Sequence, residues 1–133
     1  MNCKESKKQC FWVHFNCPDG VYLWVQGMGK VYDLYVSFSC RYLPPEIGCL
    51  KNLEYLDLSF NKIKSLPIEI SYLNDLISLK VSNNKLVELP SGLSSLQRLE
   101  NLDLSNNRLT SLGSLELSLM GNLQTLNLQV LIL

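Results

Sequence analysis

A segment of about 23 residues recurs along the chain, and no other feature of the sequence constrains the fold as strongly. The clearest copy, at residues 53–75, reads "LEYLDLSFNKIKSLPIEISYLND". The copies begin at Leu53, Leu76, Leu99 and Leu123, so their starts are 23, 23 and 24 residues apart. A fixed period of this length is typical of a solenoid, in which each repeat buries its apolar side chains against its neighbours.

Each repeat contains two apolar periodicities. In the first part, apolar and polar residues alternate, which indicates a short half-buried strand. The alternating apolar pairs are Leu56/Leu58, Leu79/Val81 and Leu102/Leu104. In the second part, apolar residues lie three or four positions apart, which suits a loose helical or 3₁₀ return on the other side. The predicted fold is an α/β solenoid of about four repeats with a short parallel sheet on its concave face.

An asparagine occupies the same position in three successive repeats, at Asn61, Asn84 and Asn107. The backbone N–H and C=O groups in the turn after each strand are buried and need partners. A side-chain amide offers two donors and an acceptor. The three asparagines are therefore predicted to form an inward-facing structural ladder that hydrogen-bonds neighbouring turns.

These recurring positions resemble the leucine-rich-repeat family over residues 31–128. "SLP" at residues 65–67 and "ELP" at 88–90 are similar to the plant intracellular Ras-group type, whereas extracellular plant receptor repeats carry Gly-x-Ile-Pro at that place. Residues 41–67 also resemble the repeat segment of plant Raf-like kinases with leucine-rich repeats. The resemblance implies a scaffold or regulatory segment whose partner is a small GTPase or a kinase-pathway component.

Composition argues against several classes of partner. Lys plus Arg equals Asp plus Glu, at 12 each, so charge gives no argument for nucleic acid or an anionic membrane. No apolar run approaches the roughly 18 to 20 residues of a membrane span, and no secretory signal is visible. There is no N-glycosylation sequon, and the five cysteines are an odd number. We expect a cytoplasmic protein with reduced thiols; an extracellular fragment with a disulfide is the alternative.

The two ends depart from the repeat. Residues 1–30 form a non-repeat segment, interpreted either as a cap with a strand at 21–25 or as unrelated sequence joined to the repeats. Residues 31–133 form the repeat domain, which is incomplete at its C-terminal end because Leu131 replaces the ladder asparagine. That end predicts a fragment or a subunit covered by a partner.

The first repeat has an irregular strand. Counting back from Leu43 places Asp33 and Tyr35 at the apolar strand positions, which slips the strand register by one residue. The alternation recovers with Leu34 and Val36 if one residue has been lost.

No motif predicts catalysis, a cofactor or a metal. "GMGKV" at residues 27–31 lacks the first glycine and the hydroxyl residue of a nucleotide-binding loop, and kinase motifs are missing. The spacings of Cys3, Cys10, His14 and Cys17 do not suit a structural zinc site. His14 is the only histidine, and no nucleophile has an evident base. The chain is not expected to be an enzyme.

The concave sheet face is the surface expected to bind. The strand residues that alternate with the leucines are predicted to point outward: Tyr55, Asp57, Ser59, Ser78, Lys80, Ser82, Asn101, Asp103, Ser105, Thr125, Asn127 and Gln129. The candidate protein-binding residues are Tyr55, Asp57, Phe60, Lys80, Asn101 and Asp103. Two interpretations stay open, a ladder whose charges satisfy one another and a recognition strip with aromatic anchors.

A row of three cations, Lys62, Lys85 and Arg108, follows the ladder asparagines. Such a row suits either an acidic partner or ordinary solvation. The function predicted for the chain is non-catalytic protein recognition in intracellular signalling, through the concave face. The alternative is a truncated repeat segment of a larger kinase that contains leucine-rich repeats.

Overall fold

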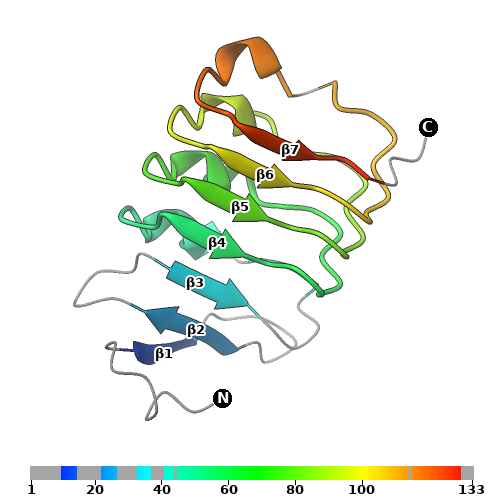
Figure 1. Ribbon diagram of the computed structural model, residues 1–133. Coiled ribbons are helices and arrows are strands. Elements are labelled where there is room, and N and C mark those ends of the chain that lie inside the picture. Colours follow the sequence, from blue (N-terminus) through cyan, green and yellow to red (C-terminus); the bar gives the residue numbers. More distant parts are fainter. Residues whose placement is uncertain are drawn as a thin grey trace.

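A single sheet runs through the whole of the described structure. The computed structural model describes residues 10–14, 22–26, 33–36, 41–43, 45–113 and 115–129, and only the backbone of the first three ranges. Within these residues, seven strands follow one another in chain order across the sheet (Figure 1). The strands are β1 (Cys10–His14), β2 (Tyr22–Gln26), β3 (Asp33–Val36), β4 (Tyr55–Asp57), β5 (Ser78–Lys80), β6 (Asn101–Asp103) and β7 (Thr125–Asn127).

Strands β3 to β7 are parallel, as the repeat pattern predicts. Between them, the chain returns through short 3₁₀ helices: η2 (Pro45–Cys49), η3 (Ile68–Tyr72), η4 (Leu93–Ser95) and η5 (Leu117–Leu119). The described residues contain no α-helix, so the return takes the 3₁₀ form. The predicted leucine-rich-repeat solenoid is confirmed.

The core lies between the sheet and the 3₁₀ returns. The central strand residues Leu56, Leu79 and Leu102 are at most 1% exposed, and the return residues Ile70 and Leu93 are fully buried. Burying a leucine side chain contributes about 2 kcal/mol. The core is therefore one apolar column that continues from repeat to repeat, and no repeat has a core of its own.

The asparagine ladder connects adjacent turns through buried hydrogen bonds. The Asn84 amide donates to the Leu58 carbonyl of the preceding repeat at 2.8 Å, and its Oδ1 accepts from the Ile63 N–H at 3.0 Å. Asn107 repeats the pattern one unit further on, donating to Val81 at 2.9 Å. Asn61 is 7% exposed and donates to Leu58 within its own turn at 2.9 Å. Each buried amide satisfies backbone groups that water cannot reach.

The irregular first repeat keeps its leucine in register. Leu34 pairs with Leu56, 22 positions further along the chain, and not Asp33 or Tyr35. Tyr42 forms a bridge to Ser65, 23 positions further along. One residue is therefore missing between β3 and Tyr42 relative to the later repeats, and the register slip counted back from Leu43 is wrong. The deletion falls in the connection, because a shift inside the strand would have paired Asp33 or Tyr35 with Leu56.

Two antiparallel strands precede the parallel part of the sheet. β2 pairs with β3, and β1 pairs with β2. The strand expected at residues 21–25 is present at Tyr22–Gln26. Pairing of β2 with β3 occupies the backbone edge of the first parallel strand, as a cap would. The domain division at residue 30 stays a prediction, and the expectations for residues 130–133, including Leu131, lie outside the described residues.

Candidate functional site

Two rows of side chains cover the concave face of β4 to β7. Strand pairing places Tyr55, Ser78, Asn101 and Thr125 in the first row. It places Asp57, Lys80, Asp103 and Asn127 in the second row. The rows consist of polar groups and one aromatic ring, since the intervening leucines point into the core. The predicted column of alternating charge is therefore present as a strand register.

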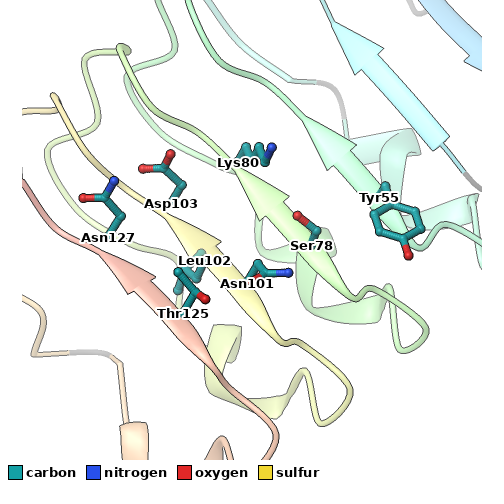
Figure 2. Close-up of a pocket in the computed structure, with 8 residues that line it drawn as sticks. All are labelled: Tyr55, Ser78, Lys80, Asn101, Leu102, Asp103, Thr125 and Asn127. Carbon is teal, nitrogen blue, oxygen red and sulfur yellow. The ribbon is translucent and has the colours of Figure 1, made fainter.

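A shallow hollow of about 430 Å³ lies on this face (Figure 2). Its lining residues are Tyr55, Ser78, Lys80, Asn101, Leu102, Asp103, Thr125 and Asn127. The Tyr55 ring, 48% exposed, stands at one end of the hollow, and Asn127 and Thr125 lie at the other. Hydrogen-bond donors, acceptors and a cation thus surround a small apolar floor, which is an arrangement suited to binding a polar ligand surface.

The carboxylates of the second row are held by their own turns. Asp57 Oδ1 accepts the Ser59 N–H at 3.0 Å. Asp103 Oδ1 accepts the Ser105 N–H at 3.0 Å and the Ser105 hydroxyl at 2.7 Å. Within the described residues, Arg98 forms an ion pair with Asp75, whereas Lys80 forms no ion pair. The exposed Lys80 ammonium is therefore available to a ligand, although two carboxylates lie on the neighbouring strands.

The serines that follow the strands do not point outward, which corrects the sequence prediction. Ser59, Ser82 and Ser105 are 8%, 8% and 6% exposed, and the Ser82 hydroxyl donates to that of Ser59 at 3.0 Å. The strands last only three residues, so the alternation of faces ends at Asp57 and its equivalents. Beyond that point the chain turns inward toward the asparagine ladder, and the serines become part of the turn.

Phe60 projects from the same turn and is unusual in two ways. Its φ is +59°, in the left-handed region that the equivalent Asn83 and Asn106 also adopt. Asparagine tolerates this region, whereas for a bulky side chain it is an outlier that costs about 1 kcal/mol or more. The ring is also 73% exposed, so packing within the chain does not offset that cost. A strained and exposed aromatic residue favours a role in contacting a partner.

The hollow gathers four of the six predicted residues. Tyr55, Lys80, Asn101 and Asp103 line it, whereas Asp57 and Phe60 do not. Asp57 lies beside Lys80 in the strand register, and Phe60 lies in the turn three residues further on. Sequence reasoning missed Leu102 as a lining residue. It is only 1% exposed, and nothing distinguishes a leucine that forms the floor of a hollow from the other core leucines.

Two other possibilities concern the described residues, a metal site and a membrane-spanning helix. No group of His, Cys, Asp and Glu among them could hold a metal ion. None of their helices is long and apolar enough to cross a membrane. The nucleotide-loop candidate at 27–31 and the side chains of Cys3, Cys10, His14 and Cys17 lie outside the described structure.

Comparison with known proteins defines the class. The model of the family described as "Leucine-rich repeat region" matches residues 26–131. The chain belongs to the leucine-rich-repeat family. No curated protein matches it significantly. The repeat domains of this family are typically protein-binding modules without catalysis, and no catalytic family is indicated.

Three solved structures illustrate the likeness. A leucine-rich-repeat protein of Leptospira interrogans is 33% identical, with TM-score 0.60, over 70% of this chain and 29% of that chain. The BIR3–SERK2 complex of Arabidopsis thaliana is 25% identical, with TM-score 0.62, over 98% of this chain and 65% of that chain. The ectodomain of the Arabidopsis thaliana receptor kinase SOBIR1 is 25% identical, with TM-score 0.57, over 96% of this chain and 80% of that chain. The chain thus spans less than two thirds of the first two of these structures.

Proposed function

We propose that this chain is a recognition module of intracellular signalling that binds a protein partner through the concave face of β4 to β7. The observation that carries the proposal is Lys80, which is exposed in the middle of the hollow while the neighbouring carboxylates bond to their own turns. A ladder of charges that merely stabilised the sheet would pair Lys80 with Asp57 or Asp103. Tyr55 and Phe60 supply the aromatic contacts that are enriched at binding hot spots.

The partner itself is proposed only by chemistry and resemblance. The lining of the hollow is polar on both rows, and such a surface complements a partner with exposed charges and hydrogen-bonding groups. A small GTPase or a component of a kinase pathway remains our proposal for that partner. One of the similar structures is itself a complex between two named proteins, which is in keeping with recognition as the task of this fold.

The test compares two triple variants that differ in the face they alter. The concave variant carries Tyr55→Ala, Asp57→Asn and Lys80→Ala. Asp57→Asn retains an acceptor for the Ser59 N–H. The control removes the same three kinds of group from the return side, through Tyr72→Ala, Asp75→Asn and Arg98→Ala. Tyr72 is as exposed as Tyr55, at 49% against 48%.

Each variant is used as bait, and the recovered proteins are quantified. We expect partners that bind the unaltered chain to be retained by the control and lost by the concave variant. Removing two or three hot-spot groups weakens binding by about 100-fold, because each costs about 1 to 2 kcal/mol. Equal recovery by both variants would mean that the concave face is the wrong surface.

We also propose that the protein works in the cytoplasm. Cys49, a cysteine whose side chain the structure describes, is a free and exposed thiol, which fits a reducing compartment. Titration of the unfolded protein, isolated without reductant, should find all five thiols reactive. A titre of three or fewer would indicate a disulfide and support the extracellular alternative.

A second candidate is a repeat segment of a larger kinase. The observation in its favour is the likeness to the ectodomain of a receptor kinase, which this chain matches over 96% of its length. Sequencing the transcript beyond the codon for Leu133 tests it. An open reading frame that continues into a kinase domain would make this module the recognition arm of that enzyme. A stop codon after Leu133 would reject it.

A further inference from the structure

A second polar hollow lies outside the concave face, and its lining carries an excess of positive charge. It forms where the chain leaves the asparagine ladder. Lys62 stands between Asn61 and Ile63, which are 7% and 0% exposed. Since both neighbours are fixed in the interior, the lysine between them must point to solvent. Lys85 and Arg108 occupy the same position in the next two repeats.

Backbone hydrogen bonds hold these positions side by side. The Lys85 N–H donates to the Ile63 carbonyl at 2.9 Å, and the Arg108 N–H donates to the Leu86 carbonyl at 2.8 Å. Neighbouring strands of a sheet lie about 4.8 Å apart, and these hydrogen bonds join the turns that follow the strands. The row of cations predicted from the sequence therefore follows from the pairing of neighbouring turns.

The first repeat adds further groups to the row. The bridge between Tyr42 and Ser65 sets Arg41 beside Lys64. A hollow of about 300 Å³ results. Its lining residues are Arg41, Tyr42, Lys62, Lys64 and Lys85. Four cations and a phenol surround this space, and none of the described residues that line it is a carboxylate.

The overall composition does not account for this charge. The chain carries 12 basic and 12 acidic residues, so a random surface would mix the two signs. On the return side, Arg98 is paired with Asp75 at 3.1 Å. Within the described residues, Lys62, Lys64 and Lys85 form no such pair. Like charges gathered in a hollow repel one another, and a bound anion would remove that repulsion.

We propose that this cationic hollow binds the phosphate group of a phosphorylated segment of the protein partner. A phosphate monoester carries nearly two negative charges and three acceptor oxygens, so several cations contact it at once. A carboxylate has one charge and two oxygens and would contact fewer of the three lysines, Lys62, Lys64 and Lys85. Phe60 lies two residues before Lys62 and is 73% exposed, so it can contact an apolar residue next to the phosphate.

This proposal rests on the proposed function, since the phosphorylated segment belongs to a protein partner. It assigns a separate surface, on the turns beyond the strands, and it defines one chemical property of the partner. Phe60 lies between the two surfaces along the chain, since it follows Asp57 of β4 by three residues and precedes Lys62 by two. A partner bound to the concave face can therefore reach the hollow.

The test measures peptide binding directly and needs no knowledge of the partner. The probe is a fluorescein-labelled Gly/Ala peptide with one phosphoserine beside a leucine, and its unphosphorylated form is the matched control. Fluorescence anisotropy is recorded with the full chain, with Lys62→Gln/Lys85→Gln, and with Lys51→Gln/Arg98→Gln, which removes the same charge from the return side. The concave triple variant is measured in parallel.

We expect saturable binding of the phosphopeptide alone, about tenfold weaker for Lys62→Gln/Lys85→Gln and unchanged for the control pair. Binding should also weaken steeply with added salt. The concave variant should bind the probe normally, so failure of the proposed function would leave this result intact. Circular dichroism melts verify that both double variants fold. We expect them to fold because none of the substituted side chains belongs to the hydrophobic core.

Three results would overturn the proposal. The first is no saturable binding at about 1 mM protein, or equal binding of both peptides. The second is an equal loss of phosphopeptide binding in the two double variants, which would mean that only the net charge of the protein matters. The third is tighter binding to phosphoinositide vesicles, or equally tight binding to inorganic phosphate, which would assign the hollow to a membrane or to free phosphate.

Discussion

Removing one asparagine of the ladder should destabilise the whole solenoid. The Asn84 amide donates to the carbonyls of Leu58, Val81 and Ser82 at 2.8, 3.1 and 3.1 Å, and it accepts from the Ile63 N–H at 3.0 Å. The side chain is 7% exposed. In Asn84→Ala, the buried Ile63 N–H loses its partner. The carbonyls of Leu58, Val81 and Ser82 keep the bonds from Asn61, Asn107 and Phe60.

The magnitude follows from the number of buried groups left without a partner. Such a group costs about 1 to 3 kcal/mol, so the single unsatisfied N–H reduces the free energy of unfolding by about 2 kcal/mol. That is a large part of the roughly 5 to 15 kcal/mol by which a domain is stable. Because the repeats share one core, the loss should lower the unfolding midpoint of the entire array.

Urea unfolding followed by circular dichroism measures this loss. Asn122→Ala is the matched control, because Asn122 is exposed and makes a single bond, to the Gln97 carbonyl at 2.7 Å. Its loss should cost about 0.5 kcal/mol. Similar effects for the two variants, or a loss below about 1 kcal/mol for Asn84→Ala, would refute the structural role of the ladder.

Four further substitutions on the return side, one of them a control, are measured by the same unfolding assay. Gly48→Ala should cost about 2 kcal/mol, because a Cβ there would lie 2.9 Å from the Glu69 Cβ and carbonyl oxygen, whereas Gly121→Ala, with nothing within 4 Å, should cost little. Equal effects would contradict the close approach. Gly92→Ala should cost about 1 kcal/mol, since its φ is +88°. Arg98→Ala should cost less than about 1 kcal/mol, because its ion pair is about half exposed and screened by salt.

The sequence predicts the regular part of this fold well, because the same residue types recur at the same positions of successive repeats. Leucines in register fix which face of each strand is buried, and an asparagine at a constant position fixes the turn. Two cations of the row, Lys62 and Lys85, follow from the same register and line the cationic hollow. These features depend on residues that are close in the repeat, so spacing alone is sufficient to place them.

Irregular positions are less accessible to this reasoning. The repeat at residues 99–122 has one extra residue. Its return buries Leu115 and Met120 and leaves Leu117 and Leu119 about half exposed. The spacing of the leucines does not predict which of them are exposed in this longer return. The buried serines were misplaced for a related reason, since the alternation gives no sign that a strand ends after three residues.

The presence of Arg41 in the lining of the cationic hollow was also not predicted from the sequence. It depends on where the missing residue of the first repeat falls, and the sequence left that position open. A single deletion in the connection preserves both the leucine register of β3 and the alignment of Tyr42 with Ser65. The charge of the hollow is thus a property of the folded register, and composition gives no indication of it.

Photo-crosslinking tests the central claim, recognition through the concave face, most directly. Benzoylphenylalanine is placed at Tyr55, which is 48% exposed on the sheet, or at Tyr72, which is 49% exposed on η3. The account predicts that a captured partner crosslinks from position 55 and not from position 72. Crosslinking from position 72 alone, or equally from both positions, would contradict it.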